Sequence, residues 1–298
     1  MVLVIGATGL LGSEVVRQLR ISGYSVRALA RSTSNPRQTQ SLQQTGAEVV
    51  YGDLKLPTSI EATVEGVEAI ITTASSTLSR QPGDSIQTVD RDGYFTLIDC
   101  AEKAGVRHFV YTSIARDMKY ESPLTRAKAE VAQHLRTSRM EHTVLAANFF
   151  MEVWLSPMLG FDPQNARATI YGSGTGPVGF VSLKDVARIA VTSLSVNECR
   201  NRTISVAGPA NTPLLEVVQI VERLSGRTFA VEHVPEDALE AKRRGATDPL
   251  EQTFAALMLE YANGCPMDMK ETLSMLPMRL TSVQEYAASV MPLESARA

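Results

Sequence analysis

The sequence has few cysteines. Its 298 residues include three, Cys100, Cys199 and Cys265, which lie far apart and form no Cys-x-x-Cys pair. This spacing argues against a zinc knuckle and against a disulfide framework. Such sparse use of cysteine is typical of a reducing compartment. A strand pattern begins at residue 2, with no charged segment or cleavage site before it, so we expect a cytoplasmic protein.

Long apolar runs and an excess of charge are also missing. No apolar run approaches the roughly 18 residues of a membrane-spanning helix, so no membrane span is expected. The net charge of −3 provides no basic field, which argues against nucleic-acid binding. The densest basic run, KRR at residues 242–244, is interpreted as a solvent-exposed helix face. The four histidines lack the spacing of a metal site, so no metal is expected.

The first half of the chain alternates short apolar runs with helical patterns. Continuous apolar strands separated by helices are typical of a parallel sheet covered on both faces. We therefore predict a doubly wound α/β domain over residues 1–150. Its expected strands cover residues 2–5, 25–30, 47–53, 67–75, 107–113 and 141–148, and its clearest helices cover residues 11–22, 89–104 and 123–138.

The second half is less regular. A glycine-rich stretch at residues 168–180 predicts loops with short strands, and most of the rest has helical patterns. Residues 151–298 are expected to form a smaller, mainly helical lobe for a substrate or partner, with the chain crossing back to the sheet.

The stretch VLVIGATGLLGSEVVRQL at residues 2–19 places Gly6, Gly9 and Gly12 between the first strand and the first helix. In such a unit the first glycine permits a tight turn, the second lets a pyrophosphate approach the backbone, and the third lets the helix pack on the strand. The phosphates then lie at the helix N-terminus. This context favours a Rossmann-type dinucleotide site over a structural turn. The same turn adds Thr8, Leu10 and Leu11 to the predicted cofactor-binding residues.

The end of the second strand predicts which dinucleotide binds. An NAD site usually has an acidic residue about 20 residues after the glycines, but this chain has Arg31 there and no acid nearby. A guanidinium suits the 2′-phosphate of NADP, and Arg37 is in a position to assist. We therefore expect NADP(H) rather than NAD. The alternative is a pair of solvated loop arginines.

Two other strand ends contribute candidates. Asp53 and Leu54 follow the third strand on the adenine side, where Asp53 would accept a hydrogen bond from the adenine amino group. The alternative for Asp53 is a turn-capping or helix-capping role. Thr73, at the end of the fourth strand, is also predicted to contact the cofactor.

Six pieces of the sequence together resemble a known family. They are GATGLLGSEV, RALAR, YGDL, AGVRHFVYTS, AKAEVAQHL and NFFMEV. The resemblance is to the NmrA-like branch of the atypical short-chain dehydrogenase/reductases, and it covers roughly residues 1–240. It implies a Rossmann lobe that binds NAD(P)H and a small C-terminal substrate lobe. That family includes reductases of quinones, dyes and phenylpropanoids, and also redox-sensing regulators that do no chemistry.

The resemblance also implies catalytic positions. The usual Tyr-x-x-x-Lys pair puts a general acid and a ribose-binding lysine on one helix face. Here the segment is LTRAK, so Lys128 is present and Leu124 replaces the tyrosine. Lys128 would serve alone, as ribose anchor or proton donor, and its alternative is a helix-surface lysine. Ser113 matches the family's serine on the fifth strand, and both Ser113 and Tyr111 are expected to face the crevice.

Apolar residues after the sixth strand suggest a substrate. Phe149, Phe150, Met151 and Trp154 are expected to line an apolar pocket, and Phe149 to contact the cofactor; the alternative is ordinary core. The first hypothesis is an NADPH-dependent reductase of a small apolar quinone or activated carbonyl. The second, favoured by Leu124, is an inactive redox sensor that acts through a protein partner. A third is an assembly factor that uses the fold as a scaffold.

Overall fold

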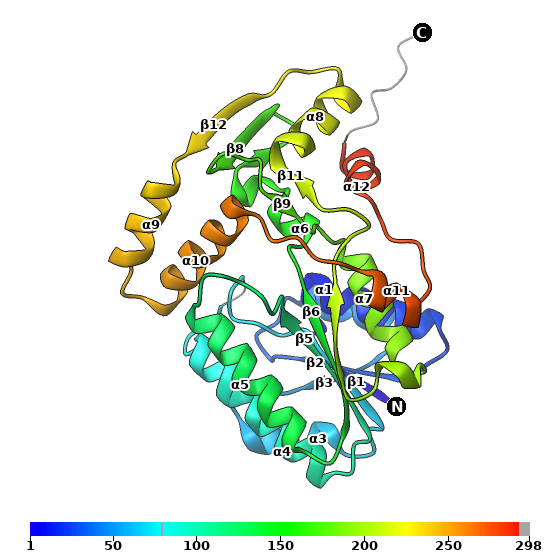
Figure 1. Cartoon of the computed structure of the whole chain (residues 1–298). Helices are drawn as coiled ribbons and strands as arrows, with labels where there is room; N and C mark the ends of the chain where they lie inside the picture. The colour runs from blue at the N-terminus through cyan, green and yellow to red at the C-terminus, as the bar shows by residue number, and fades with distance from the viewer. Residues whose placement is uncertain (79, 292–298) are drawn as a thin grey trace.

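The computed structural model describes residues 1–78 and 80–291, and a seven-stranded parallel sheet lies at its centre (Figure 1). The strands run in the order β10-β6-β5-β4-β1-β2-β3, which confirms the doubly wound α/β fold. The order reverses at β1, so the carboxyl ends of β1 and β4 flank the crevice where ligands bind in such sheets. The strands are β1 (Val2–Ile5), β2 (Val26–Ala30), β3 (Glu48–Tyr51), β4 (Ala69–Thr72), β5 (His108–Ile114), β6 (Glu141–Ala147) and β10 (Arg202–Val206).

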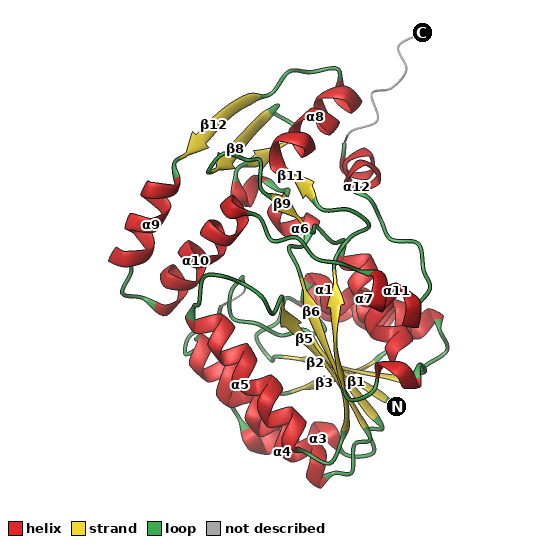
Figure 2. Ribbon diagram, viewed as in Figure 1, coloured by secondary structure: helices red, strands yellow, loops and turns green. Residues whose placement is uncertain are grey.

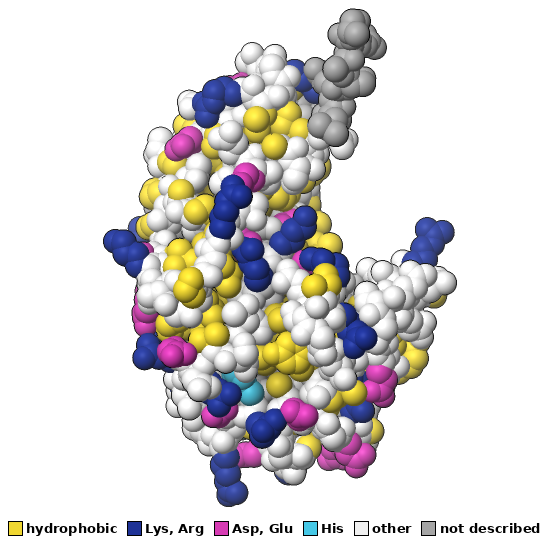
Figure 3. Space-filling model, turned by 90° about the vertical axis from the view of Figure 1, so that its right-hand side faces the viewer, with side chains coloured by type: hydrophobic (Ala, Val, Ile, Leu, Met, Phe, Trp, Pro, Cys, Tyr) yellow, Lys and Arg dark blue, Asp and Glu magenta, His cyan; other side chains and the backbone are white. Residues whose placement is uncertain are grey.

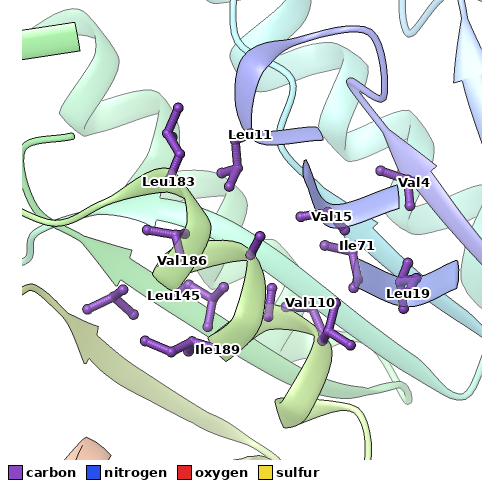
Figure 4. Close-up of a cluster of buried hydrophobic side chains, with 14 of the residues drawn as sticks. Val4, Leu11, Val15, Leu19, Ile71, Val110, Leu145, Leu183, Val186 and Ile189 are labelled. Carbon is purple, nitrogen blue, oxygen red and sulfur yellow. The ribbon is translucent and has the colours of Figure 1, made fainter. Parts of the chain in front are cut away.

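Helices cover both faces of the sheet, because neighbouring residues of each strand point to opposite sides. Val4 enters the core on one face, whereas Leu3 and Ile5 enter the core on the other. Figure 4 shows the first of these cores, where α1 and α7 pack against the strands. That face carries α1 (Leu10–Ile21), α2 (Pro36–Gln44), α7 (Leu183–Ser193) and α11 (Lys270–Met275). The other carries α3 (Pro57–Val64), η1 (Ile86–Gly93), α4 (Tyr94–Lys103) and α5 (Pro123–Thr137).

The segment before α4 has a wider helical turn than the sequence pattern predicts. A helix over residues 89–104 was expected, but the π-helical segment η1 begins at Ile86 and continues directly into α4. Ser85 caps it: the Ser85 Oγ accepts the Thr88 N–H at 3.0 Å, and the Thr88 Oγ1 accepts the Ser85 N–H at 2.9 Å. π-Helical turns often occur at functional sites.

The second half of the chain contributes to two bodies. It returns α7, β10 and α11 to the main sheet, where β10 pairs with β6. The rest forms a lobe beyond the carboxyl ends of the strands (Figure 2). Its strands are β7 (Phe161–Asp162), β8 (Arg167–Tyr171), β9 (Pro177–Val178), β11 (Thr212–Pro213) and β12 (Ala230–Val234). Its helices are α6 (Met151–Trp154), η2 (Pro157–Leu159), α8 (Leu214–Ser225), α9 (Glu236–Gly245), α10 (Pro249–Asn263) and α12 (Val283–Val290). The short helix η3 (Asn197–Cys199) precedes β10 of the main sheet.

Charged side chains are spread over the face in Figure 3, with small apolar patches between them. Within residues 1–78 and 80–291, no helix has the length and apolar character needed to cross a membrane.

Candidate functional site

The three glycines of the turn between β1 and α1 differ in how strongly backbone packing constrains them. Gly6 has φ +80°, and a Cβ there would lie 2.7 Å from the Ala74 nitrogen. A Cβ on Gly12 would lie 2.0 Å from the Gly6 carbonyl oxygen. At Gly9, which is exposed, the nearest atom to an added Cβ would be the Gly6 oxygen at 3.3 Å. Gly6 and Gly12 are therefore required by backbone packing, whereas a Cβ on Gly9 would make one tight contact, with the Gly6 oxygen, and the exposed side of Gly9 is left to a ligand.

The start of α1 fits the phosphates of a dinucleotide. Gly9 is the N-cap of α1, and among the described residues no side chain caps its first N–H groups. Such N–H groups attract an anion. Leu10 beside them is 63% exposed, whereas Leu11 is buried in the core. The Thr73 Oγ1 donates to the carbonyl oxygens of Ile5 at 3.1 Å and Gly6 at 3.3 Å, so this side chain holds the turn in shape.

Arg31 lies directly after β2, and its guanidinium is already paired. Its Nη1 lies 2.5 Å from the Oδ2 of Asp84, a carboxylate in the loop after β4. The Lys55 ammonium pairs with the other Asp84 oxygen, and its Nζ lies 3.6 Å from the Asp53 Oδ2. Burial alone would raise the pKa of Asp84, but hydrogen bonds from Lys55, the Gln81 N–H and Arg31 outweigh it and keep that pKa below its usual value. Arg37 is exposed at the start of α2.

Asp53 caps a turn in the structure. Its Oδ1 accepts the Lys55 backbone N–H at 2.9 Å, which is an Asx turn between β3 and α3. The hydrogen bond that the adenine amino group would donate to Asp53 stays a prediction. Leu54 is buried, and a Cβ on Gly93 at the end of η1 would lie only 2.8 Å from the Leu54 Cβ. Leu54 therefore fixes the approach of η1 to the end of β3.

Lys128 is a buried lysine of α5, 7% exposed, so the helix-surface alternative is wrong. Its Nζ donates to the Thr112 carbonyl oxygen of β5 at 3.3 Å. The Nζ also lies 5.3 Å from the ring centroid of Tyr111 and 5.9 Å from that of Tyr94, within range of cation–π attraction. Burial lowers the pKa of Lys128, and the negative charge of Asp90 opposes this effect.

Of the positions around Lys128, Tyr111 differs from expectation. Leu124, at the tyrosine position, is buried in an apolar cluster with Ile86 and Ala127. Tyr111 is fully buried and packs edge-on against Tyr94, with ring centroids 5.1 Å apart, so it does not face an open crevice. Ser113, two residues further along the same side of β5, is partly exposed and pairs in register with Ala146 of β6.

The apolar residues after β6 form a core. Phe149 is 4% exposed, and its ring centroid lies 4.5 Å from that of Trp154 and 5.4 Å from that of Tyr261 on α10. Because these rings pack directly against one another, Phe149 and Trp154 do not line an open pocket. Met151 lines a pocket of about 190 Å³ together with Phe180, Thr212, Ile220 and Val283, between α8 and the start of α12.

The C-terminal lobe also holds the loop that leads into α5. The Glu260 carboxylate of α10 is 2% exposed and accepts the N–H groups of Lys119 at 2.8 Å and Tyr120 at 3.2 Å. Burial raises the pKa of Glu260, and these two N–H groups oppose the rise. Tyr120 therefore lies in a loop that α10 holds, as its place before Pro123 predicts.

Sequence reasoning missed Asp84, Asp90 and Glu260. Asp90 had a signal, because it falls on the same helical face as the apolar residues Ile86, Val89 and Leu97. An acid on a buried face indicates a paired or functional charge. Asp84 lies in an irregular loop, where no periodic pattern marks it.

Comparisons with known proteins agree with this architecture. A model of the NmrA-like family matches residues 1–287. The photosystem II assembly factor Ycf39 of Guillardia theta is 32% identical over 237 residues, which cover 78% of this chain and 73% of that protein.

Two solved structures share the fold at 21% identity. The triphenylmethane reductase of Citrobacter sp. in complex with NADP(H) has a TM-score of 0.79 and covers 98% of this chain and 100% of its own. The Escherichia coli NADPH-dependent quinone oxidoreductase QOR2 in complex with NADPH has a TM-score of 0.77 and covers 97% of this chain and 99% of its own.

Proposed function

The chain belongs to the NmrA-like family, and on that premise we propose that it binds NADP(H) and reduces a small apolar quinone or an activated carbonyl compound. The observation that carries the proposal is the glycine turn. Gly9 is a glycine although packing constrains it less than Gly6 or Gly12, since an added Cβ would make one tight contact, 3.3 Å from the Gly6 oxygen, and it lies at the N-terminus of α1. A pyrophosphate that needs close backbone approach explains both facts.

Each part of the site has a role toward NADPH. The N–H groups at the start of α1 would bind the pyrophosphate, and Arg31 would bind the 2′-phosphate. Lys128 would hold the nicotinamide ribose and supply a proton beside Ser113. When bound, NADPH supplies a hydride. The chain therefore has to orient the substrate, exclude water and deliver one proton.

The proton requirement decides the substrate class. Leu124 occupies the position of the usual acid and is buried in an apolar cluster. A quinone that accepts a hydride becomes a hydroquinone anion, which takes a proton from water or from Lys128. An unactivated ketone becomes a strongly basic alkoxide, which needs a strong local acid. Quinones and activated carbonyl compounds are therefore favoured over simple ketones.

The test is NADPH oxidation followed by absorbance under anaerobic conditions, with a panel of quinones and a matched panel of unactivated ketones. Gly9→Val serves as the cofactor-binding control. We expect turnover with quinones, little with ketones, and none with quinones in the Gly9→Val protein. Brisk ketone reduction that survives Lys128→Ala would contradict the proposal, because it requires another acid.

The relatives favour a second candidate. The chain is 32% identical to a photosystem II assembly factor, and it lacks the tyrosine of a typical reductase site. The second proposal is a protein that binds NADP(H) and acts through a protein partner, as redox sensor or assembly factor. It expects tight NADPH binding, no turnover with any compound of the panel, and hydrogen exchange that slows beyond the cofactor site when NADPH binds. Turnover with a quinone would favour the first candidate.

A further inference from the structure

Asp90 of η1 is a fully buried carboxylate in which one of the two oxygens accepts hydrogen bonds from described residues. Its side chain is 0% exposed. The Oδ2 accepts the Ser76 N–H at 3.0 Å and the Ser76 hydroxyl at 2.6 Å. The Oδ1 is also buried, and it has no hydrogen-bond partner within the described parts of the chain. A buried carboxylate oxygen without a partner is costly unless a positive charge lies near it.

Lys128 lies in the same buried region, because α5 packs against η1 and the Lys128 Nζ is 5.9 Å from the ring centroid of Tyr94, one helical turn after Asp90. The Lys128 ammonium has three donors, and among described residues the Thr112 carbonyl is its one hydrogen-bond partner. The Tyr94 hydroxyl donates to the Ala74 carbonyl at 2.7 Å. The hydroxyl of Tyr111 is buried and lacks a partner in the described structure. The region is thus polar and closed, and the Oδ1 of Asp90 and the hydroxyl of Tyr111 are its unused acceptors.

Two of these groups carry charge. Burial raises the pKa of both tyrosines, and Asp90 adds to that rise, so the two phenols stay neutral. The ionisable groups that face Lys128 are therefore Asp90 from η1, Tyr94 from α4 and Tyr111 from β5. Asp90 supplies the negative charge that opposes the effect of burial on Lys128. Coulomb attraction is strong in such a low-dielectric region even without direct contact.

We propose that Asp90 is the buried counter-charge of Lys128, a positioning residue that keeps the Lys128 side chain cationic and holds it beside the end of β5. Burial disfavours the ammonium form of Lys128, and the negative charge of Asp90 opposes that effect. This inference rests on the proposed function in one respect: the proposed function names the nicotinamide ribose as the ligand of the Lys128 ammonium.

The test measures the charge of Lys128 directly. The chain has seven lysines, so ¹³C-labelling of lysine side chains gives few enough signals to assign Lys128 with the Lys128→Met protein. Asp90→Asn removes the charge while its amide oxygen keeps both Ser76 hydrogen bonds. Asp92→Asn is the matched control, because Asp92 lies on the same segment and is half exposed. In the Asp90→Asn protein we expect the Lys128 signal to titrate at lower pH, by about one unit or more.

An unchanged Lys128 titration in Asp90→Asn, or an equal change in Asp92→Asn, would overturn the inference. A double-mutant cycle covers the case in which Asp90→Asn is too unstable to study. The double variant Asp90→Asn/Lys128→Met should have a higher free energy of unfolding than Asp90→Asn alone, because no buried ammonium is then left without its counter-charge, and strictly additive losses would equally overturn the inference.

NADPH affinity separates this inference from the proposed function. If Asp90 holds the charge and Lys128 binds the ribose, the Asp90→Asn protein should lose NADPH affinity several-fold as the pH rises, and the Asp92→Asn protein should not. A shifted Lys128 titration with unchanged NADPH affinity at every pH would support the counter-charge and contradict the role of Lys128 in cofactor binding.

Discussion

Arg31 and Asp84 join the end of β2 to the loop after β4, with Nη1 and Oδ2 2.5 Å apart. The carboxylate is almost fully buried, and it also pairs with Lys55. A guanidinium has five N–H donors in a planar fork. The Asp84 contact uses one of the two terminal nitrogens, so Arg31 keeps donors for a phosphate while Asp84 restricts its rotamers. The arginine predicted to recognise NADP is thus held in place by a residue 53 positions away in the chain.

Replacing Arg31 should remove most of the preference for NADPH over NADH. We choose Arg31→Gln, because an aspartate there would face Asp84 and add repulsion. A charge-assisted hydrogen bond contributes about 1.5–3 kcal/mol, so the ratio of the two dissociation constants should change by about tenfold or more. Calorimetry with both cofactors measures it, and Arg37→Gln is the control. Equal affinities for NADPH and NADH in the unmodified protein would contradict the assignment of Arg31.

The three glycines should respond differently to substitution. Gly9→Val should abolish NADPH binding and lower the free energy of unfolding less than Gly12→Ala does, because a Cβ at Gly9 would lie 3.3 Å from the Gly6 oxygen and a Cβ at Gly12 only 2.0 Å from it. Gly12→Ala should lower the free energy of unfolding by about 1–3 kcal/mol or more, because its Cβ overlaps the Gly6 carbonyl. Urea unfolding and calorimetry check both. A folded Gly9→Val protein with unchanged NADPH affinity would refute the dinucleotide interpretation of the turn.

Substitutions of Lys128 and Leu124 on α5 should have different effects. Lys128→Ala should weaken NADPH binding and reduce quinone turnover together, since one side chain serves both. Leu124→Tyr should not create ketone reduction, because residue 124 is enclosed by Ile86 and Ala127. The larger ring should instead lower the free energy of unfolding by about 1–3 kcal/mol. Steady-state kinetics and urea unfolding measure these effects. A gain of ketone reduction in Leu124→Tyr would show that residue 124 reaches the nicotinamide.

His108 should make the fold sensitive to acid. It is 5% exposed at the start of β5, and its Nε2 lies 3.0 Å from the Thr143 Oγ1. Burial, reinforced by the nearby Arg200, lowers the pKa of His108 to about 4. The unfolded chain, with a pKa of about 6.5, therefore binds the proton first as the pH falls. The free energy of unfolding should decrease between about pH 6.5 and pH 4, by on the order of 3 kcal/mol.

Urea unfolding of His108→Gln at about pH 7 and about pH 4.5 checks this contribution. The variant should lose less stability on acidification than the unmodified protein, because glutamine does not titrate. His233→Gln, at an exposed position of β12, is the control. The same pH dependence in His108→Gln and the unmodified protein would exclude His108 as the cause.

Local patterns in the sequence were enough to predict the framework of the nucleotide lobe. The strand, glycine turn and helix at residues 2–21, and the Ser122 and Pro123 start of α5, were predicted from the sequence and are present. These features have short-range causes: the period of the apolar residues, the positive φ of Gly6, and the Ser122 hydroxyl, which caps the first N–H groups of α5. The glycine spacing also predicted a dinucleotide, because the residues expected to contact its phosphates lie within one turn of the chain.

Only the tertiary structure decided which distant groups meet. It packed η1, which carries Asp90, against α5, which carries Lys128. It also brought Asp84 to Arg31, and it packed Phe149 against Trp154 and Tyr261 instead of beside an open pocket. Periodicity tells which face of an element is buried, but not which partner covers that face. The partner depends on how the second half of the chain folds back onto the sheet. Close packing and the pairing of buried charges then involve residues that are far apart in the sequence.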